Sequence, residues 1–149
     1  MDDAKHMRKM LELRSLPSWN DMKYLAVLYG LEGCEVFHLL DDETKDREWN
    51  GIGSDAFPKF IRRFLDFLFE DALPAACIHD FRFVIGGPKD DFYKANGELK
   101  RNLFKCLRAN KKHYSFIGYH LTKLKIRLAV WLCNEFGYEG WRNKTNETN

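Results

Sequence analysis

The sequence of 149 residues lacks the features of a membrane protein or a disulfide-rich protein. Its four cysteines lie far apart without a CxxC pair, which argues against a zinc ribbon and excludes a dense disulfide scaffold, so we expect reduced, buried thiols. No run approaches the roughly 20 consecutive apolar residues of a membrane span, and the amino terminus is too charged for a signal peptide. We therefore expect a cytoplasmic or virion-associated protein without a signal peptide or transmembrane segment.

Several common catalytic signatures are also missing. The sequence contains no HExxH helix, no P-loop and no GxSxG elbow, so the usual zinc protease, NTPase and hydrolase patterns are absent. The adjacent residues His79 and Asp80 could suggest an HD-type phosphohydrolase. That class would need another histidine upstream of the pair, for which His38 is available, and an aspartate well downstream of it. No aspartate follows Asp91, which argues against that class.

Acidic residues are scarce in one part of the chain. Residues 94–127 contain 10 Lys/Arg and a single acidic residue, Glu98, whereas residues 1–93 contain 12 Lys/Arg and 18 Asp/Glu. A basic helix can face an anionic membrane surface, nucleic acid or solvent. The basic segment from Lys100 to Lys112 is therefore a candidate contact for a phospholipid surface or for nucleic acid, and a solvated face is the alternative.

The composition, 45% hydrophobic and 31% charged, is typical of a single globular domain, which we expect to span residues 1–149. Apolar side chains recur at three- and four-residue spacing, and prolines, glycines and capping residues bound these stretches. The pattern predicts helices over about residues 3–14, 58–70, 74–84, 89–110 and 114–137.

The front of the chain admits two interpretations. Ser18 and Asp21 have the spacing of a capping box that opens a segment ending at Gly30. That segment is either a helix or a strand, residues 23–29, which pairs with residues 34–40 in a small β-hairpin. The polar residues 41–53 predict a loop, and residues 142–149 a flexible tail. The predicted fold class is mainly α, with a loop-rich N-terminal part in which the hairpin remains an alternative.

The helix after Pro74 carries the most informative residues, His79 and Asp80. Adjacent residues of an α-helix point about 100° apart, so the two side chains address neighbouring directions. One helix can in this way supply both a general base and a metal ligand. The alternative is a partly buried histidine beside a solvated carboxylate.

Asn96 lies on the apolar stripe of the next predicted helix, where a buried amide needs a hydrogen-bond partner. Two antiparallel helices joined by the short Gly-Gly-Pro turn would bring Asn96 to His79. A hydrogen bond to one imidazole nitrogen would fix the tautomer and leave the other nitrogen free to accept a proton. A hydrogen bond from Asn96 to nearby backbone is the alternative.

Upstream, the sequence Trp-Asn-Gly-Ile-Gly-Ser-Asp over residues 49–55 contains the alternating glycines Gly51 and Gly53. Such glycines allow backbone carbonyls to turn toward a common centre. Calcium takes six to eight oxygen ligands, so these carbonyls with one carboxylate and water could form a site. An ordinary loop is the alternative.

Together these stretches resemble the phospholipase A₂ superfamily, particularly its compact viral branch and a related phage and prophage family. Members place a glycine-rich calcium loop before a helix bearing His-Asp-x-x-Tyr, and bring a second helix bearing an Ala-Asp pair against it. Here these read Trp-Asn-Gly-Ile-Gly-Ser, His-Asp-Phe-Arg-Phe and Lys-Ala-Asn-Gly-Glu-Leu. The likeness covers about residues 49–107, and residues 136–141 look like the end of the phage family's pattern, so the phospholipase-like core would span 49–141.

The resemblance implies a phospholipase-like antiparallel helix pair followed by an additional long C-terminal helix. It implies a calcium-dependent phospholipid acyl hydrolase in which His79 is the general base, Asp80 holds calcium, and Gly51 and Gly53 contribute carbonyl ligands. The metal would polarise the ester carbonyl and stabilise the developing oxyanion.

Two residues depart from the family's pattern and imply a weakened or inactive site. The second carboxylate behind the histidine is Asn96 here, and the tyrosine four positions after the histidine is Phe83. The rival interpretation is therefore a non-catalytic phage structural or interaction protein that keeps the same helical scaffold.

Overall fold

The computed structural model describes residues 18–49 and 70–148, and every regular element in these ranges is helical. The predicted mainly α fold class is therefore confirmed. Two short 3₁₀ helices, η1 (Glu70–Ala72) and η2 (Lys111–His113), accompany the α-helices. The α-helices are α2 (Trp19–Leu28), α3 (Val36–Leu39), α4 (Asp42–Glu48), α6 (Leu73–Ile85), α7 (Lys89–Ala109), α8 (Phe116–Phe136) and α9 (Tyr138–Thr148).

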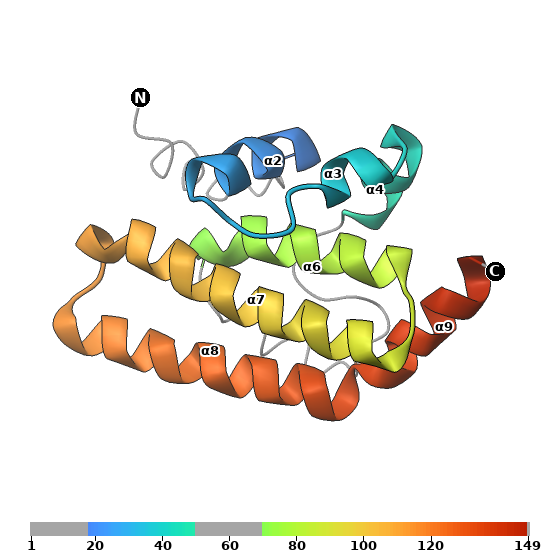
Figure 1. Ribbon diagram of the computed structural model, residues 1–149. Coiled ribbons are helices and arrows are strands. Elements are labelled where there is room, and N and C mark those ends of the chain that lie inside the picture. Colours follow the sequence, from blue (N-terminus) through green and yellow to red (C-terminus); the bar gives the residue numbers. More distant parts are fainter. Residues whose placement is uncertain (1–17, 50–69, 149) are drawn as a thin grey trace.

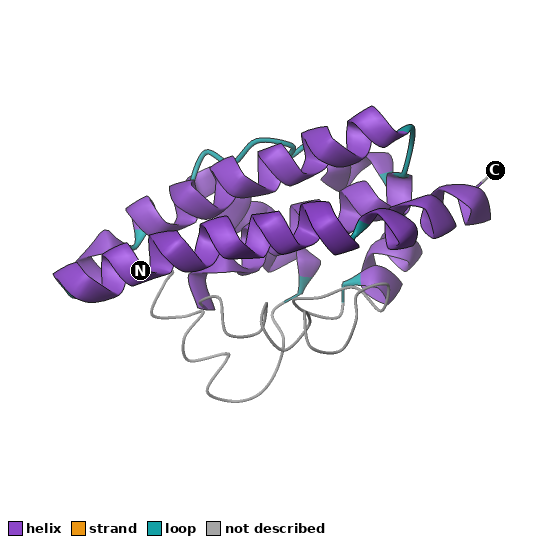
Figure 2. Cartoon of the chain, turned by 90° about the horizontal axis from the view of Figure 1, so that it is seen from below, coloured by secondary structure: helices purple, strands orange, loops and turns teal. Residues whose placement is uncertain are grey.

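The long helices α6, α7 and α8 lie side by side, with α7 packed against both of its neighbours (Figure 1). On the far side of α6 from α8 lie α2, α3 and α4, and α9 packs against the end of α6. Figure 2 shows the same helices from below. The core between them contains large fully buried side chains from both halves of the chain, among them Met22, Phe37, Phe81, Phe92, Ile126 and Trp141.

The turn between α6 and α7 makes these two helices antiparallel neighbours, as predicted. Gly86 and Gly87 have φ of +67° and +130°, a region that L side chains rarely adopt. A Cβ on Gly86 would also collide with Thr145 of α9. Pro88 then sits at the N-cap of α7, which lets the chain reverse within three residues.

The front segment is a helix, so the alternative β-hairpin is wrong. Ser18 and Asp21 form the predicted capping box: the Ser18 hydroxyl accepts from the Asp21 amide, and the Asp21 carboxylate accepts from the Ser18 amide. The capped helix α2 takes residues 19–28, and α3 lies within the segment proposed as the partner strand. Met22, Leu25 and Ala26 are buried at helical spacing, so one face of α2 joins the core.

Residues 42–48, predicted as part of a loop, form α4. The Asp41 carboxylate caps its N-terminus by accepting from the Thr44 amide at 2.7 Å. Asp42 and Glu43 lie in the first turn, and Lys45 and Arg47 in the last, where each charge sign complements the helix dipole. A polar composition was therefore compatible with a short helix because its charges are ordered along the axis.

Residues 142–148, predicted as a flexible tail, belong to α9. Trp141 is 2% exposed, and its indole N–H donates to the carbonyl of Gly87 at 2.8 Å. One turn later, the Thr145 hydroxyl accepts from the Gly87 amide at 3.1 Å. These contacts tie α9 to the turn between α6 and α7.

Two predicted helices, over residues 3–14 and 58–70, lie outside the described residues except for residue 70, which begins η1. The other three agree with α6, α7 and α8 to within two residues. Among the helices that the structure describes, none combines the length and apolar character needed to cross a bilayer.

The four cysteines are free thiols, as predicted. Cys77, Cys106 and Cys133 are buried, and Cys34 is half-buried. Burial raises the pKa of both Cys106 and Cys133 to about 12, which keeps these thiols protonated and unreactive at neutral pH.

Candidate functional site

The antiparallel pair of α6 and α7 brings His79 and Asn96 together. The imidazole Nε2 lies 2.8 Å from the Asn96 Oδ1, so the hydrogen bond predicted from the sequence is present. His79 is 5% exposed and Asn96 is fully buried. A buried amide at this position is therefore satisfied by the imidazole across the helix interface.

A third residue, Asn134 of α8, extends this hydrogen bond into a chain. The Asn96 Nδ2 donates to the Asn134 Oδ1 at 2.8 Å. Because the Asn96 amide nitrogen is engaged there, its Oδ1 accepts from His79, which places the proton on Nε2 and the free lone pair on Nδ1. Sequence reasoning missed Asn134, although its place beside the core-facing Cys133 in the predicted helix was a usable signal.

The aromatic side chain of Phe83 packs against the imidazole. The Phe83 ring centroid lies 4.8 Å from that of His79, and Phe83 packs edge-on against Trp141 at 5.1 Å. Burial lowers the pKa of His79 to about 4, an effect that the hydrogen bond with Asn96 opposes only in part. The imidazole is therefore neutral at physiological pH.

Asp80 lies next along α6 in a different environment. Its Oδ2 is buried and has no hydrogen-bond partner among the residues that the structure describes. Burial raises the pKa of Asp80 well above its usual range, and the negative charge of Glu48 on α4 raises it further. Glu48 is itself paired with Lys144 of α9 at 3.3 Å. Sequence reasoning did not connect Glu48 with Asp80, because 32 residues separate them and α4 was predicted as a loop.

Asp80, Gly51 and Gly53 are the residues predicted to bind calcium. The unpaired buried oxygen of Asp80 fits one hard-oxygen ligand, because a cation would supply the missing partner. Gly51 and Gly53 lie outside the described residues. Within residues 18–49 and 70–148, no three His, Cys, Asp or Glu side chains gather closely enough to hold a metal ion. Of the residues predicted as calcium ligands, the described part of the chain therefore contains Asp80, whose acidic neighbour is Glu48.

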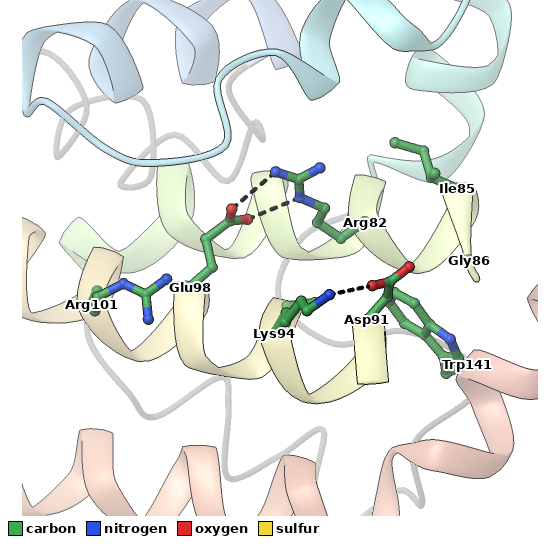
Figure 3. Close-up of a pocket in the computed structure, with 9 residues that line it drawn as sticks. Arg82, Ile85, Gly86, Asp91, Lys94, Glu98, Arg101 and Trp141 are labelled. Atoms are coloured by element: carbon green, nitrogen blue, oxygen red, sulfur yellow. Dashed lines mark hydrogen bonds and ion pairs between the residues drawn. The ribbon is translucent and has the colours of Figure 1, made fainter. Parts of the chain in front are cut away.

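A separate pocket of about 450 Å³ lies beside α6 and α7 near their connecting turn (Figure 3). Its charges are largely neutralised within the molecule. Arg82 donates two hydrogen bonds to the Glu98 carboxylate at 3.0 and 2.9 Å, and it also contacts Glu35. Lys94 pairs with Asp91 at 3.1 Å. Neither His79 nor Asp80 lines this pocket. Its Arg82–Glu98 ion pair joins α6 to α7, whereas Asp91 and Lys94 both belong to α7.

Part of the basic segment on α7 faces the molecule's own turn before α3. Arg101 pairs with the Glu32 carboxylate at 2.7 Å, and Lys105 donates to the Gly30 carbonyl at 2.9 Å. Lys100 and Arg108 are exposed. The segment therefore presents less free positive charge than its sequence indicates.

The histidine required by the HD-type alternative does not join this site, because His38 is exposed on α3 whereas His79 is buried between α6 and α7. Comparisons of the chain with protein-family models, with curated proteins and with solved structures found no match. Function is therefore inferred from the geometry of His79, Asp80 and Asn96 and from the sequence resemblance.

Proposed function

We propose that this protein is a calcium-dependent phospholipid acyl hydrolase of low intrinsic activity, similar to the phospholipase A₂ superfamily and of phage or prophage origin. The observation that carries the proposal is the 2.8 Å hydrogen bond between His79 Nε2 and Asn96 Oδ1. It places the free lone pair on Nδ1, as a general base requires, while Asp80 follows directly on the same helix.

In this mechanism His79 first accepts a proton and then donates the same proton. Its Nδ1 accepts a proton from water as the water oxygen attacks the ester carbonyl carbon. The resulting imidazolium then returns the proton to the leaving alkoxide, which releases fatty acid and lysophospholipid. Asn96 orients the ring through both steps, but its neutral amide stabilises the imidazolium less than a carboxylate would.

Asp80 would hold the calcium ion, and Gly51 and Gly53 are the remaining proposed ligands. Calcium, when bound, supplies polarisation of the ester carbonyl and compensates the negative charge on its oxygen. Supporting this assignment is the buried Asp80 Oδ2, which has no hydrogen-bond partner among the described residues. A bound cation would favour the ionised form of Asp80, against the burial and the Glu48 charge that raise its pKa.

A second candidate function is a non-catalytic interaction protein on this scaffold. The 5% exposure of His79 and its pKa of about 4 favour it, because both weaken a general base. In this case the hydrogen bonds that link His79, Asn96 and Asn134 hold α6, α7 and α8 together, and the three residues take no part in catalysis. The two candidates differ in whether the native chain hydrolyses ester bonds.

The hydrolase proposal is tested by release of fatty acid from vesicles of phosphatidylcholine and phosphatidylglycerol, measured by mass spectrometry. We expect slow release in millimolar calcium, none above background in EDTA, and none in His79→Ala. The matched control is His38→Ala, which removes an exposed histidine from α3 and should retain the native rate. Release that persists in EDTA or in His79→Ala would contradict the proposal, and a native chain without release would favour the interaction protein.

Calcium binding at Asp80 is tested separately by thermal unfolding. Because an ion that binds only the folded state stabilises it, the melting temperature should rise with calcium concentration, by several degrees at about one hundred times the Kd. Asp80→Asn should abolish the rise, and Asp46→Asn, which changes an exposed carboxylate on α4, should preserve it. An equal rise in the native chain and in Asp80→Asn would place calcium elsewhere.

A further inference from the structure

The outer face of α8 exposes five large apolar side chains in one line. We call this line the outer stripe, and its members are between 46% and 71% exposed. They are Ile117, Leu121, Leu124, Leu128 and Trp131. Isolated exposed apolar residues are common, but a contiguous line of them on one helix marks an interaction surface.

The outer stripe lies outside the core that the described residues form. The residues that α8 buries against its neighbours are Thr122, Ile126, Ala129, Val130 and Cys133. At about 100° per residue, the outer stripe lies on the opposite side of the helix from these positions. In Figure 1 α8 forms the lower edge of the molecule below α7, and Figure 2 looks at it from below. Among the described helices, α8 packs against α7 and α9.

The spacing within the outer stripe is that of a helix–helix seam. Successive members are four, three, four and three residues apart, which is the strict a/d alternation of a heptad repeat. If Leu121 and Leu128 are a positions, Ile117, Leu124 and Trp131 are d positions. The seam rises about 21 Å along the axis, the length of two heptads. A seam this narrow is typical of a helix that packs against another helix, whereas a helix that faces lipid has a broader apolar surface.

Positive charge borders the outer stripe on both sides. In the same heptad frame Lys125 takes an e position and Arg127 a g position, and both are exposed. Lys111 and Lys123 instead lie 5.6 and 4.8 Å from the centre of the Tyr119 ring, and Tyr119 takes an f position on the other side of the helix from the stripe. The one acidic residue of α8, Glu135, lies beyond the last member of the stripe.

These charges decide between possible occupants. Pairing α8 with a second copy of itself would bring cations against cations, which opposes association. A partner helix with acidic residues at its own e and g positions would instead form favourable pairs across the seam. We infer that the outer stripe of α8 binds one amphipathic helix of a partner protein, with apolar residues at a and d and acidic residues beside them. This inference is independent of the proposed hydrolase activity.

The experiment uses the full chain and two synthetic four-heptad peptides with identical leucines at a and d. One peptide carries Glu at every e and g position, which keeps it from self-pairing, and the other carries Lys. Calorimetry should show one acidic peptide bound per chain, with affinity at least about tenfold above that for the basic peptide and weaker at high salt. Lys125→Glu combined with Arg127→Glu should reverse this preference.

The apolar contribution is tested with Leu124→Gln combined with Leu128→Gln, which should reduce binding of the acidic peptide at least about tenfold. Both residues are exposed, so folding should be preserved. Val27→Gln combined with Leu28→Gln, which changes exposed residues of α2, is the matched control and should bind as the native chain does. Equal binding of both peptides, or of neither, would overturn the inference. So would a dimer in sedimentation that Leu124→Gln dissolves, or a preference for phosphatidylglycerol vesicles over the acidic peptide.

Discussion

Asn96→Asp is expected to raise the calcium-dependent release of fatty acid from phospholipid vesicles by about 10²-fold or more over the native chain. The reason is electrostatic. When Nδ1 of His79 accepts a proton from water, a carboxylate on Nε2 stabilises the imidazolium, whereas the native amide only orients the ring. Exchange of a carboxylate for an amide in a serine protease triad costs about 10⁴-fold in rate, so partial recovery of that factor is expected here.

The surroundings of Asn96 can accommodate this change. Aspartate has nearly the shape of asparagine, and its Oδ1 can still accept from His79 Nε2. The second oxygen would face Asn134 Oδ1, and a flip of the Asn134 amide would present its Nδ2 as a donor instead. Phe83→Tyr, which adds a hydroxyl beside the imidazole ring, should increase the gain when combined with Asn96→Asp.

A matched control separates this effect from a general effect of added charge. Asn102 is also fully buried on α7, but it hydrogen-bonds to the backbone of Glu32, away from His79. Asn102→Asp should therefore leave hydrolysis per folded molecule unchanged. Asn96→Asp should also raise the pKa of His79, as measured by NMR titration. A raised pKa without any calcium-dependent hydrolysis would refute the catalytic role and favour the interaction protein.

The second large effect concerns stability against pH, measured in EDTA by chemical unfolding. The folded pKa of His79 is about 4, below its ordinary value of 6.5, so the unfolded chain binds a proton that the folded chain excludes in this range. Relative to His79→Gln, the native chain should therefore lose about 3 kcal/mol of unfolding free energy as the pH falls from 6.5 to 4. If the difference in unfolding free energy between the two proteins did not change with pH, the imidazole would accept its proton as easily in the folded state as in the unfolded state.

Asp80 should make the unfolding free energy depend on pH in the opposite direction. Its folded pKa is raised well above the ordinary 3.8, so the folded chain retains a proton that the unfolded chain has lost. Relative to Asp80→Asn, the native chain should become less stable as the pH rises above about 4, until Asp80 ionises in the folded state. Asp80→Asn should therefore stabilise the apo-protein at neutral pH, and calcium should reverse the order by stabilising the native chain alone. A destabilised Asp80→Asn at neutral pH in EDTA would contradict this.

The sequence by itself determined the elements that local signals define. The capping box of Ser18 starts α2, and the turn of Gly86 and Gly87 both ends α6 and makes α7 antiparallel to it. These signals act within one turn of the chain, so a reader of the sequence can recognise them. The same locality explains why the pairing of His79 with Asn96 was predictable: the turn is short, and both residues lie on the faces that the two helices bury.

Only the tertiary structure decided the features that depend on distant contacts. The polar residues 142–148 form a helix because α9 is anchored through Trp141 and Thr145 to Gly87, more than 50 residues away. Asn134 and Glu48 reach the site from α8 and α4 for the same reason. In α8 the apolar period predicted a helix but did not predict which of its faces is buried. The five side chains of the outer stripe keep the period yet face outward, because the smaller Ala129 and Cys133 on the opposite side allow close packing within the core. Which of two apolar faces is buried depends on the shape of the neighbouring helices, and that information does not reside in the helix's own sequence.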